Sequence, residues 1–164
     1  MLVRTMQPAD LAAVYHIQTQ AYVADMVEAP ALLASRLAAA PACAWVVEQG
    51  DQVVAYLAAY PSRHGRISAL GQEFQPAQPA NALYLHDMAV APEQAGRGLA
   101  RAMLASALEY AGAQGWQYAC LVSVQSTRSY WQNQGFMAQT ELNEEQKAKL
   151  DTYVGPACYM IRTL

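Results

Sequence analysis

The sequence predicts a mixed α/β fold in which helices flank one central sheet. Its 164 residues suit one domain with a buried core, so residues 1–164 are expected to form a single domain. Hydrophobic residues make up 54% of the chain and charged residues 14%, a balance that excludes a disordered segment. Strand-like and helix-like apolar patterns alternate in an irregular order, which favours a mixed sheet over a regular doubly wound one.

The first half of the chain predicts one strand, two helices and a β-hairpin. Apolar residues recur at helical spacing through the first helix. Pro30 is acceptable in the first turn of the second helix, and Pro41 ends that helix. Gly50 supplies the positive φ angle of a tight turn between two apolar runs. The expected elements are strand Leu2–Met6, helices Pro8–Tyr22 and Ala29–Ala39, and strands Ala44–Glu48 and Gln52–Tyr60.

A long loop separates these elements from a second alternating series. The loop, Pro61–Asn81, contains three prolines and two glycines, and loops of this length inside a domain are often functional. An apolar stripe marks the helix that follows the next strand, and Gly112 and Gly115 bracket its end. The expected elements are strand Leu83–Val90, helix Gly98–Ala113, strand Gln117–Val122, helix Ser126–Asn133, strand Phe136–Thr140, helix Asn143–Leu150 and strand Ala157–Arg162.

Charge and cysteine usage exclude several classes of function. The formal net charge is −3, with ten scattered basic residues against thirteen acidic ones, so neither nucleic acid nor an anionic membrane surface is an expected partner. No signal peptide or apolar run of membrane-spanning length is found. Cys43, Cys120 and Cys158 lie in apolar surroundings, and this odd number favours free thiols and a cytoplasmic location. Neither C-x-x-C nor H-E-x-x-H occurs, so no metal site is expected.

The turn Ala91–Arg101 is the most informative segment of the sequence. It joins a buried strand to a helix, and Gly96 and Gly98 let the backbone approach a ligand closely. The first turn of the helix offers free amides and a partial positive charge, so the turn can cradle a phosphate or pyrophosphate. It matches neither a dinucleotide fingerprint nor a P-loop. An ordinary strand-to-helix turn, with glycines that serve only its geometry, is the alternative.

The run Leu83–Phe136 resembles the core of the GNAT superfamily of acyl-CoA N-acyltransferases. Gly98-Leu99-Ala100 matches the second half of that family's Gln/Arg-x-x-Gly-x-Gly/Ala loop, although Ala95 occupies the Gln/Arg position. Ser129–Phe136 is similar to the aromatic and Gly-Phe end of the family's last helix. The resemblance implies a mostly antiparallel central sheet that is splayed between its fourth and fifth strands. It also implies transfer of an acetyl group from acetyl-CoA directly to an amine in a ternary complex, without a metal.

The resemblance assigns the cofactor contacts to three stretches of the chain. Main-chain groups of the fourth strand would pair with the pantetheine arm like an added strand, and the glycine-containing turn would hold the pyrophosphate. Two further residues are candidates for contact with the cofactor, with capping or packing as the alternative for each. The expected contacts are Met88, Ala89, Val90, Ala95, Gly96, Arg97, Gly98, Leu99, Ala100, Arg101, Ser126 and Trp131.

Three residues are candidates for the acid and the base of the transfer reaction. A lysine-like amine is neutral in only about one molecule in two thousand at pH 7, so amine transfer requires a base or desolvation. His86 and Asp87 lie on the strand beside the cofactor, and the ordinary pKa of a histidine suits a base better than that of an aspartate. Because neighbouring residues of an ideal strand face opposite sides, at most one should face the site; a structural role is the alternative for each. Relatives often use a tyrosine as acid at the position of Trp131, which leaves the adjacent Tyr130 as the candidate here.

The resemblance also implies that the acceptor site is formed by the first two helices and the long loop. Its occupant would be a small-molecule amine or a peptide, and the sequence does not identify the acceptor, the acyl length, or whether the chain is a monomer or a homodimer. Two alternatives are a catalytically weak acyl-CoA sensor domain and a nucleotide-binding module. The candidate lining residues are Tyr22, Asp25, Glu28, Arg63, His64, Arg66 and Glu73.

Overall fold

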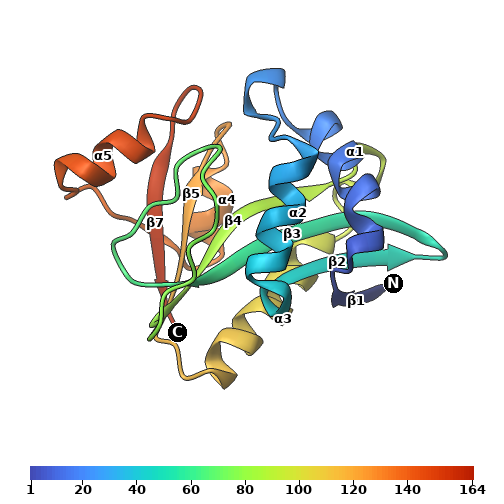
Figure 1. Cartoon of the computed structure of the whole chain (residues 1–164), viewed down its shortest axis with the longest axis horizontal. Helices are drawn as coiled ribbons and strands as arrows, with labels where there is room; N and C mark the ends of the chain where they lie inside the picture. Colours follow the sequence, from blue (N-terminus) through green and yellow to red (C-terminus); the bar gives the residue numbers. More distant parts are fainter.

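The structure, a computed structural model, describes residues 1–164 and contains one seven-stranded sheet (Figure 1). All neighbouring strands are antiparallel except the pair β4–β5, which is parallel. The predicted mixed sheet, mostly antiparallel, is therefore confirmed. In spatial order the strands are β1 (Leu2–Thr5), β2 (Ala44–Gln49), β3 (Gln52–Ser62), β4 (Ala82–Val90), β5 (Tyr118–Ser123), β7 (Cys158–Thr163) and β6 (Met137–Ala138).

Helices cover both faces of the sheet, because alternate residues of its strands are apolar on both sides. Val46 of β2 belongs to the core cluster under the first two helices, whereas its neighbour Trp45 packs edge-on against Tyr110 of the third helix, with ring centroids 5.8 Å apart. No helix combines the length and apolar character needed to cross a membrane. The helices are α1 (Leu11–Ala21), α2 (Pro30–Ala39), α3 (Leu99–Ala113), α4 (Arg128–Asn133) and α5 (Glu144–Leu150).

Most element boundaries differ by one or two residues from those expected from the sequence, and three of the differences are informative. The first helix begins as a 3-10 turn at Pro8–Asp10 and becomes α-helical only from Leu11. Strand β3 continues past Tyr60 because Pro61 and Ser62 still pair with β4. The expected strand Phe136–Thr140 shrinks to Met137–Ala138, since this edge strand has only β7 as a neighbour.

The sheet opens between β4 and β5. The two strands pair only from Ala82–Tyr118 to Leu85–Leu121, so no ladder joins the carboxyl half of β4 to β5. On its other edge β4 stays paired with β3, but the register shifts: Ala58 lies opposite Asp87 and Ala59 opposite Leu85. His86 is therefore an extra residue, a β-bulge that bends the strand at the point of separation. The expected splay between the fourth and fifth strands is present.

Candidate active site

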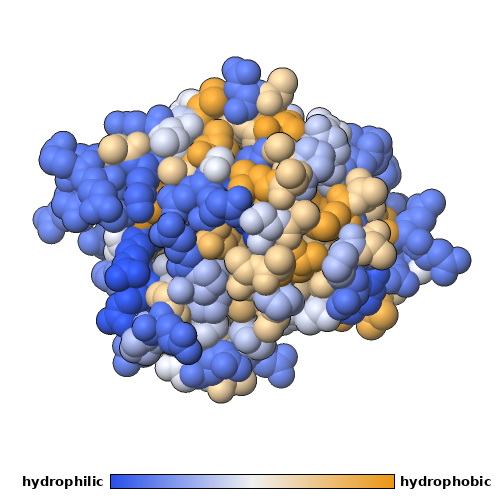
Figure 2. Space-filling view, viewed as in Figure 1, coloured by the Kyte–Doolittle hydropathy of each residue, from blue (hydrophilic) through white to orange (hydrophobic).

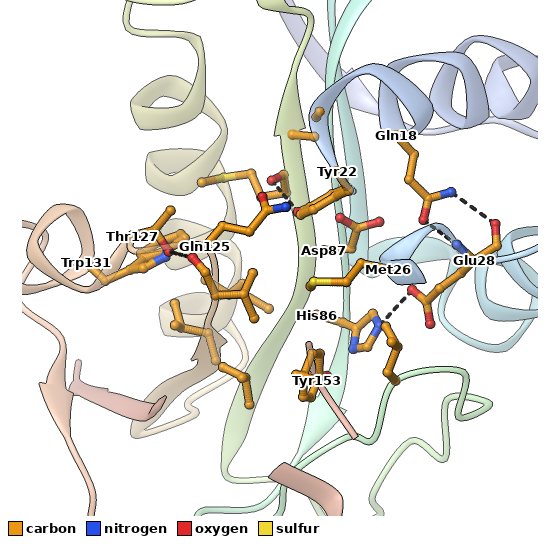
Figure 3. A pocket seen from close by; sticks show the side chains of 18 of the residues that line it. Gln18, Tyr22, Met26, Glu28, His86, Asp87, Gln125, Thr127, Trp131 and Tyr153 are labelled. Carbon is orange, nitrogen blue, oxygen red and sulfur yellow. Dashed lines mark hydrogen bonds and ion pairs between the residues drawn. The ribbon is translucent and has the colours of Figure 1, made fainter. Parts of the chain in front are cut away.

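A cavity of about 260 Å³ occupies the opening between β4 and β5 (Figure 3). Residues 85–90 of β4 form one wall, and the end of β5 with α4 forms the other. The segment that connects α1 to α2 and two loops complete the lining, which is mostly apolar and includes Tyr22, Met26, Leu70 and Tyr153. Figure 2 shows that, on the face seen in Figure 1, hydrophobic residues gather near the middle of the molecule while the α5 end is hydrophilic.

The turn that follows β4 presents a row of unpaired backbone amides. Gly96 and Gly98 have φ angles of +77° and +76°, a left-handed conformation that glycine adopts without steric cost. None of the amides from Gly96 to Arg101 donates a hydrogen bond to another group of the protein, and the first bond into α3 is donated by Ala102 to the Gly98 carbonyl. A Cβ atom on either glycine would meet open space. The turn is thus an exposed anion cradle at the start of a long helix.

The bulge places His86 and Asp87 on the same face of the sheet. The His86 ring stacks near Tyr84, with centroids 6.3 Å apart, and Asp87 accepts a 2.7 Å hydrogen bond from the hydroxyl of Tyr56. Tyr56 belongs to the core cluster under α1 and α2. Tyr84 contacts Tyr60, which stacks on Phe74 beneath Arg36 of α2. His86 and Asp87 therefore face the α1–α2 side, and both line the cavity. The expectation that at most one of them faces the site is therefore wrong, because the extra residue shifts the alternation by one position.

A buried ion pair between Glu28 and Arg36 contacts His86, and Glu28 lies in the segment just before α2. Both oxygens of Glu28 accept hydrogen bonds from the Arg36 guanidinium, each 2.6 Å long, and the Gly71 amide donates to the same carboxylate at 2.8 Å. Burial alone would raise the pKa of Glu28, but hydrogen bonds from His86 and Arg36 hold that pKa well below its ordinary value. An ionised carboxylate only accepts, so His86 donates its Nε2–H to Glu28 over 3.1 Å.

This arrangement leaves two buried acceptors without partners. With its proton on Nε2, the neutral form of His86 carries a lone pair on Nδ1, and Nδ1 has no hydrogen-bond partner. Oδ1 of Asp87 is likewise buried and unpartnered. Burial raises the pKa of Asp87, and the hydrogen bond from Tyr56 offsets only part of that effect. Orphaned buried acceptors are rare in folded proteins and are typical of sites that receive a donor.

The opposite wall carries two aromatic residues in edge contact. Trp131 is buried against Phe136, with ring centroids 5.4 Å apart, and it also lines the cavity. Tyr130 packs edge-on against Trp131 at 5.0 Å and is 36% exposed. Burial of part of its ring raises the pKa of Tyr130, so its phenol keeps its proton at neutral pH. Ser126 does not line the cavity: its side chain is exposed, between two neighbours that do.

The structure brings together most, but not all, of the residues expected at the site. The glycine-containing turn lies beyond the end of β4, outside the lining itself. Of the expected acceptor residues, Tyr22 and Glu28 line the cavity, and Tyr22 donates a 3.0 Å hydrogen bond to the Met88 carbonyl. Asp25, Arg63, His64, Arg66 and Glu73 do not line it. The predicted residues that do are His86, Asp87, Met88, Ala89, Val90, Tyr130 and Trp131.

Several residues of the site escaped the sequence analysis. Gln18 lies on the buried stripe of α1 and fixes the Glu28 backbone, donating to its carbonyl at 3.1 Å and accepting from its amide at 2.9 Å. A polar residue in an apolar helical stripe was a signal that could have identified it. Tyr153 follows α5 and donates to the Ser68 carbonyl. Nothing in the local sequence separates it from the chain's other tyrosines. No cluster of three or more His, Cys, Asp or Glu residues is arranged to hold a metal ion.

Comparison with known proteins identifies what this geometry resembles. The model of the acetyltransferase (GNAT) family matches residues 11–136. Among curated proteins, none matches the sequence.

Three solved structures illustrate the likeness in fold. The GNAT-like decarboxylase GphF, in complex with isobutyryl-CoA, has 16% identity and a TM-score of 0.73 over 99% of both chains. The ribosomal-protein-S18-alanine N-acetyltransferase from Escherichia coli has 17% identity and a TM-score of 0.69, over 99% of this chain and 92% of that one. A GNAT acetyltransferase from Brucella melitensis, in complex with acetyl-CoA, has 21% identity and a TM-score of 0.60, over 84% and 82%.

Proposed function

The chain belongs to the acetyltransferase (GNAT) family, and we propose that it transfers an acetyl group from acetyl-CoA to a primary amine of a small molecule or peptide. The observation that carries the proposal is the opening between β4 and β5, where a cavity meets two unpartnered acceptors on one side and a cradle of free amides beyond its end. A GNAT structure from Brucella melitensis contains acetyl-CoA, which supports this choice of donor.

The residues on the donor side suit coenzyme A. Six consecutive free amides, Gly96 to Arg101, at the start of the 15-residue helix α3 suit a pyrophosphate, aided by the helix dipole. The exposed side chains of Arg97 and Arg101 add positive charge there. No ladder occupies the edge of Met88–Val90 that faces β5, so it can pair with an extended pantetheine arm. Trp131 supplies an apolar wall. Ser126 is not included, because its side chain lies outside the cavity.

Acid–base work is divided between the two walls of the cavity. Bound acetyl-CoA supplies an activated thioester: the amine nitrogen forms a C–N bond, the C–S bond breaks, and one proton is released. Asp87 takes that proton from the amine, a task for which a pKa raised by burial is favourable. His86 accepts a hydrogen bond from the amine at Nδ1 and thereby orients it. Tyr130, protonated and beside Trp131, is the donor for the leaving thiolate.

The test combines turnover with binding. Purified protein is mixed with acetyl-CoA and a panel of primary amines and peptides, release of free CoA thiol is followed, and acetyl-CoA affinity is measured by titration calorimetry. Amine-dependent thiol release is expected, and Asp87→Asn should abolish most of it without loss of acetyl-CoA affinity. Asp25→Asn is the matched control, because Asp25 is an exposed carboxylate before α2 that does not line the cavity.

Two other outcomes would replace the proposal. Tight acetyl-CoA binding without thiol release for any amine would identify an acyl-CoA sensor domain. Displacement of CoA by ATP or NAD at equal concentrations would instead identify a nucleotide-binding module.

A further inference from the structure

The polar atoms in the acceptor half of the cavity restrict the kind of ligand that can bind there. Nδ1 of His86 and Oδ1 of Asp87 are both buried, both lack a partner, and both lie on the face to which the bulge turns them. With His86 neutral and Asp87 ionised, both atoms accept hydrogen bonds and neither donates. A group with two or more N–H bonds on one atom, as in a primary amine or ammonium, can satisfy both.

The charges around these atoms have one sign. Among the twenty residues that line the cavity, the acidic ones are Glu28 and Asp87, and no lysine or arginine is present. Arg36, which lies behind Glu28, is buried and uses four of its five N–H bonds: it donates two hydrogen bonds to Glu28 and two to the Gln72 carbonyl. Its charge is already paired with Glu28, and Arg36 itself does not line the cavity. A negative group on the substrate would enter this half of the cavity without a counter-ion, which is costly away from water.

The rest of the acceptor side is apolar. Met26, Leu70 and the rings of Tyr22 and Tyr153 line it together with His86. Tyr22 and Tyr153 already donate their hydroxyl hydrogens to the Met88 and Ser68 carbonyls. In Figure 3 Met26 lies beside both His86 and Asp87, and its unbranched side chain can adapt to a ligand. A hydrocarbon or aromatic body next to the amine is therefore accommodated better than a polar one.

We infer that the acceptor is a primary amine on an apolar body with no carboxylate next to the amine, so that free α-amino acids are excluded while simple amines and amidated or peptide-bonded residues are admitted. This inference rests on the proposed acetyl transfer and adds the class of acceptor. The exclusion arises from the sign of the charges at Glu28 and Asp87 and from the commitment of Arg36.

The experiment compares three acceptors that share one phenyl group. Thiol release from acetyl-CoA is measured at one pH with phenethylamine, phenylalaninamide and phenylalanine. Phenethylamine and phenylalaninamide should be acetylated, and kcat/KM for phenylalanine should be at least 100-fold lower than for phenethylamine. The amine of phenylalanine is no more basic than that of phenethylamine, so easier deprotonation cannot explain this preference. Phenylalaninamide controls for size, because its amide group replaces the carboxylate at similar volume.

A charge introduced into the lining provides the converse test. Leu70 is half-buried in the loop that covers the cavity, so a lysine there can reach a substrate carboxylate while its stem remains packed. Leu70→Lys should raise the ratio of kcat/KM for phenylalanine to that for phenethylamine at least tenfold. Leu70→Met, which changes shape without charge, should leave the ratio within about twofold.

The outcomes separate this inference from the proposed function. Phenylalanine acetylated as efficiently as phenethylamine would overturn the acceptor class while leaving amine acetylation intact. A ratio that Leu70→Lys and Leu70→Met change equally would also overturn it, because charge would not be the cause. If none of the three amines, nor any in the wider panel, releases thiol although acetyl-CoA binds, the proposed function fails and the acceptor class with it.

Discussion

Asp87→Asn is expected to make the protein less active and more stable. The Asp87 carboxylate is buried, with one hydrogen bond from Tyr56 and one oxygen without a partner. Burial raises its pKa, and each unit of such a rise costs the folded state about 1.4 kcal/mol at neutral pH. Asparagine keeps an oxygen for Tyr56 and carries no charge. We therefore expect the free energy of unfolding at pH 7 to rise by roughly 1–3 kcal/mol, the usual cost of a buried polar group without a partner.

The pH dependence of this gain has a definite sign. Because the pKa of Asp87 is higher in the folded than in the unfolded chain, the wild-type protein loses stability as pH rises from the ordinary aspartate pKa through the raised one. The asparagine side chain does not titrate, so the gain in stability from Asp87→Asn should vanish below the ordinary aspartate pKa and be full above the raised pKa. Urea unfolding at a series of pH values measures it.

Asp10→Asn is the matched control, for which the expected change in stability has the opposite sign. Asp10 accepts two hydrogen bonds from Arg4, at 2.8 and 2.9 Å, and these lower its pKa more than burial raises it. Its contribution to stability is present above the ordinary aspartate pKa and is lost as pH falls through the lowered one. Asp10→Asn should therefore destabilise the protein at neutral pH and lose its effect in acid.

Activity completes the prediction for Asp87. Loss of a general base costs about 10²- to 10⁴-fold in turnover, so thiol release by Asp87→Asn should fall by that factor while acetyl-CoA affinity is unchanged. Wild-type turnover should fall as acid protonates Asp87. If Asp87→Asn is less stable at every pH and equally active, both the desolvated charge and the role as base are refuted.

Three further variants test other parts of the site. Gly98→Glu and the hairpin variant Gly50→Glu place the same side chain at left-handed glycines, with φ angles of +76° and +61°, so each variant should lose about 1–2 kcal/mol of stability. In calorimetry, only Gly98→Glu should weaken acetyl-CoA binding, and by at least tenfold. Tyr130→Phe should lower kcat about 10- to 100-fold with unchanged acetyl-CoA affinity; unchanged kcat would remove it as the acid. Arg36→Met should cost about 3–5 kcal/mol in urea unfolding because it strands the buried Glu28 charge, and adding Glu28→Leu should recover part of that loss; no recovery would contradict the ion-pair explanation.

Local patterns were sufficient to predict the architecture. Apolar spacing, Pro41 and the Gly50 turn placed helices and strands within a few residues of their positions, because each depends on neighbours in the sequence. The glycine turn before α3 was predicted for the same reason. That it serves coenzyme A stays a prediction, as does the single-domain organisation.

The chemistry of the cavity depends on partners that are distant in the sequence. No glycine or proline marks His86 as the extra residue of β4; the bulge exists only through the register with β3. Glu28 and His86 are 58 positions apart, and the choice of Arg36 as the partner of Glu28 requires the packing of α2. Tyr153 reaches the site only because of where α5 ends. Periodicity carries none of this information.

The ion pair beneath the long loop has a consequence for how the acceptor pocket is formed. Arg36 holds the Gln72 carbonyl and Glu28 holds the Gly71 amide, so a glycine- and proline-containing loop is anchored to charges in the protein interior. Much of the conformational entropy that such a loop would otherwise lose on ligand binding is thus lost during folding. The loop over the pocket is therefore preorganised, and acceptor binding does not have to supply the free energy of ordering it.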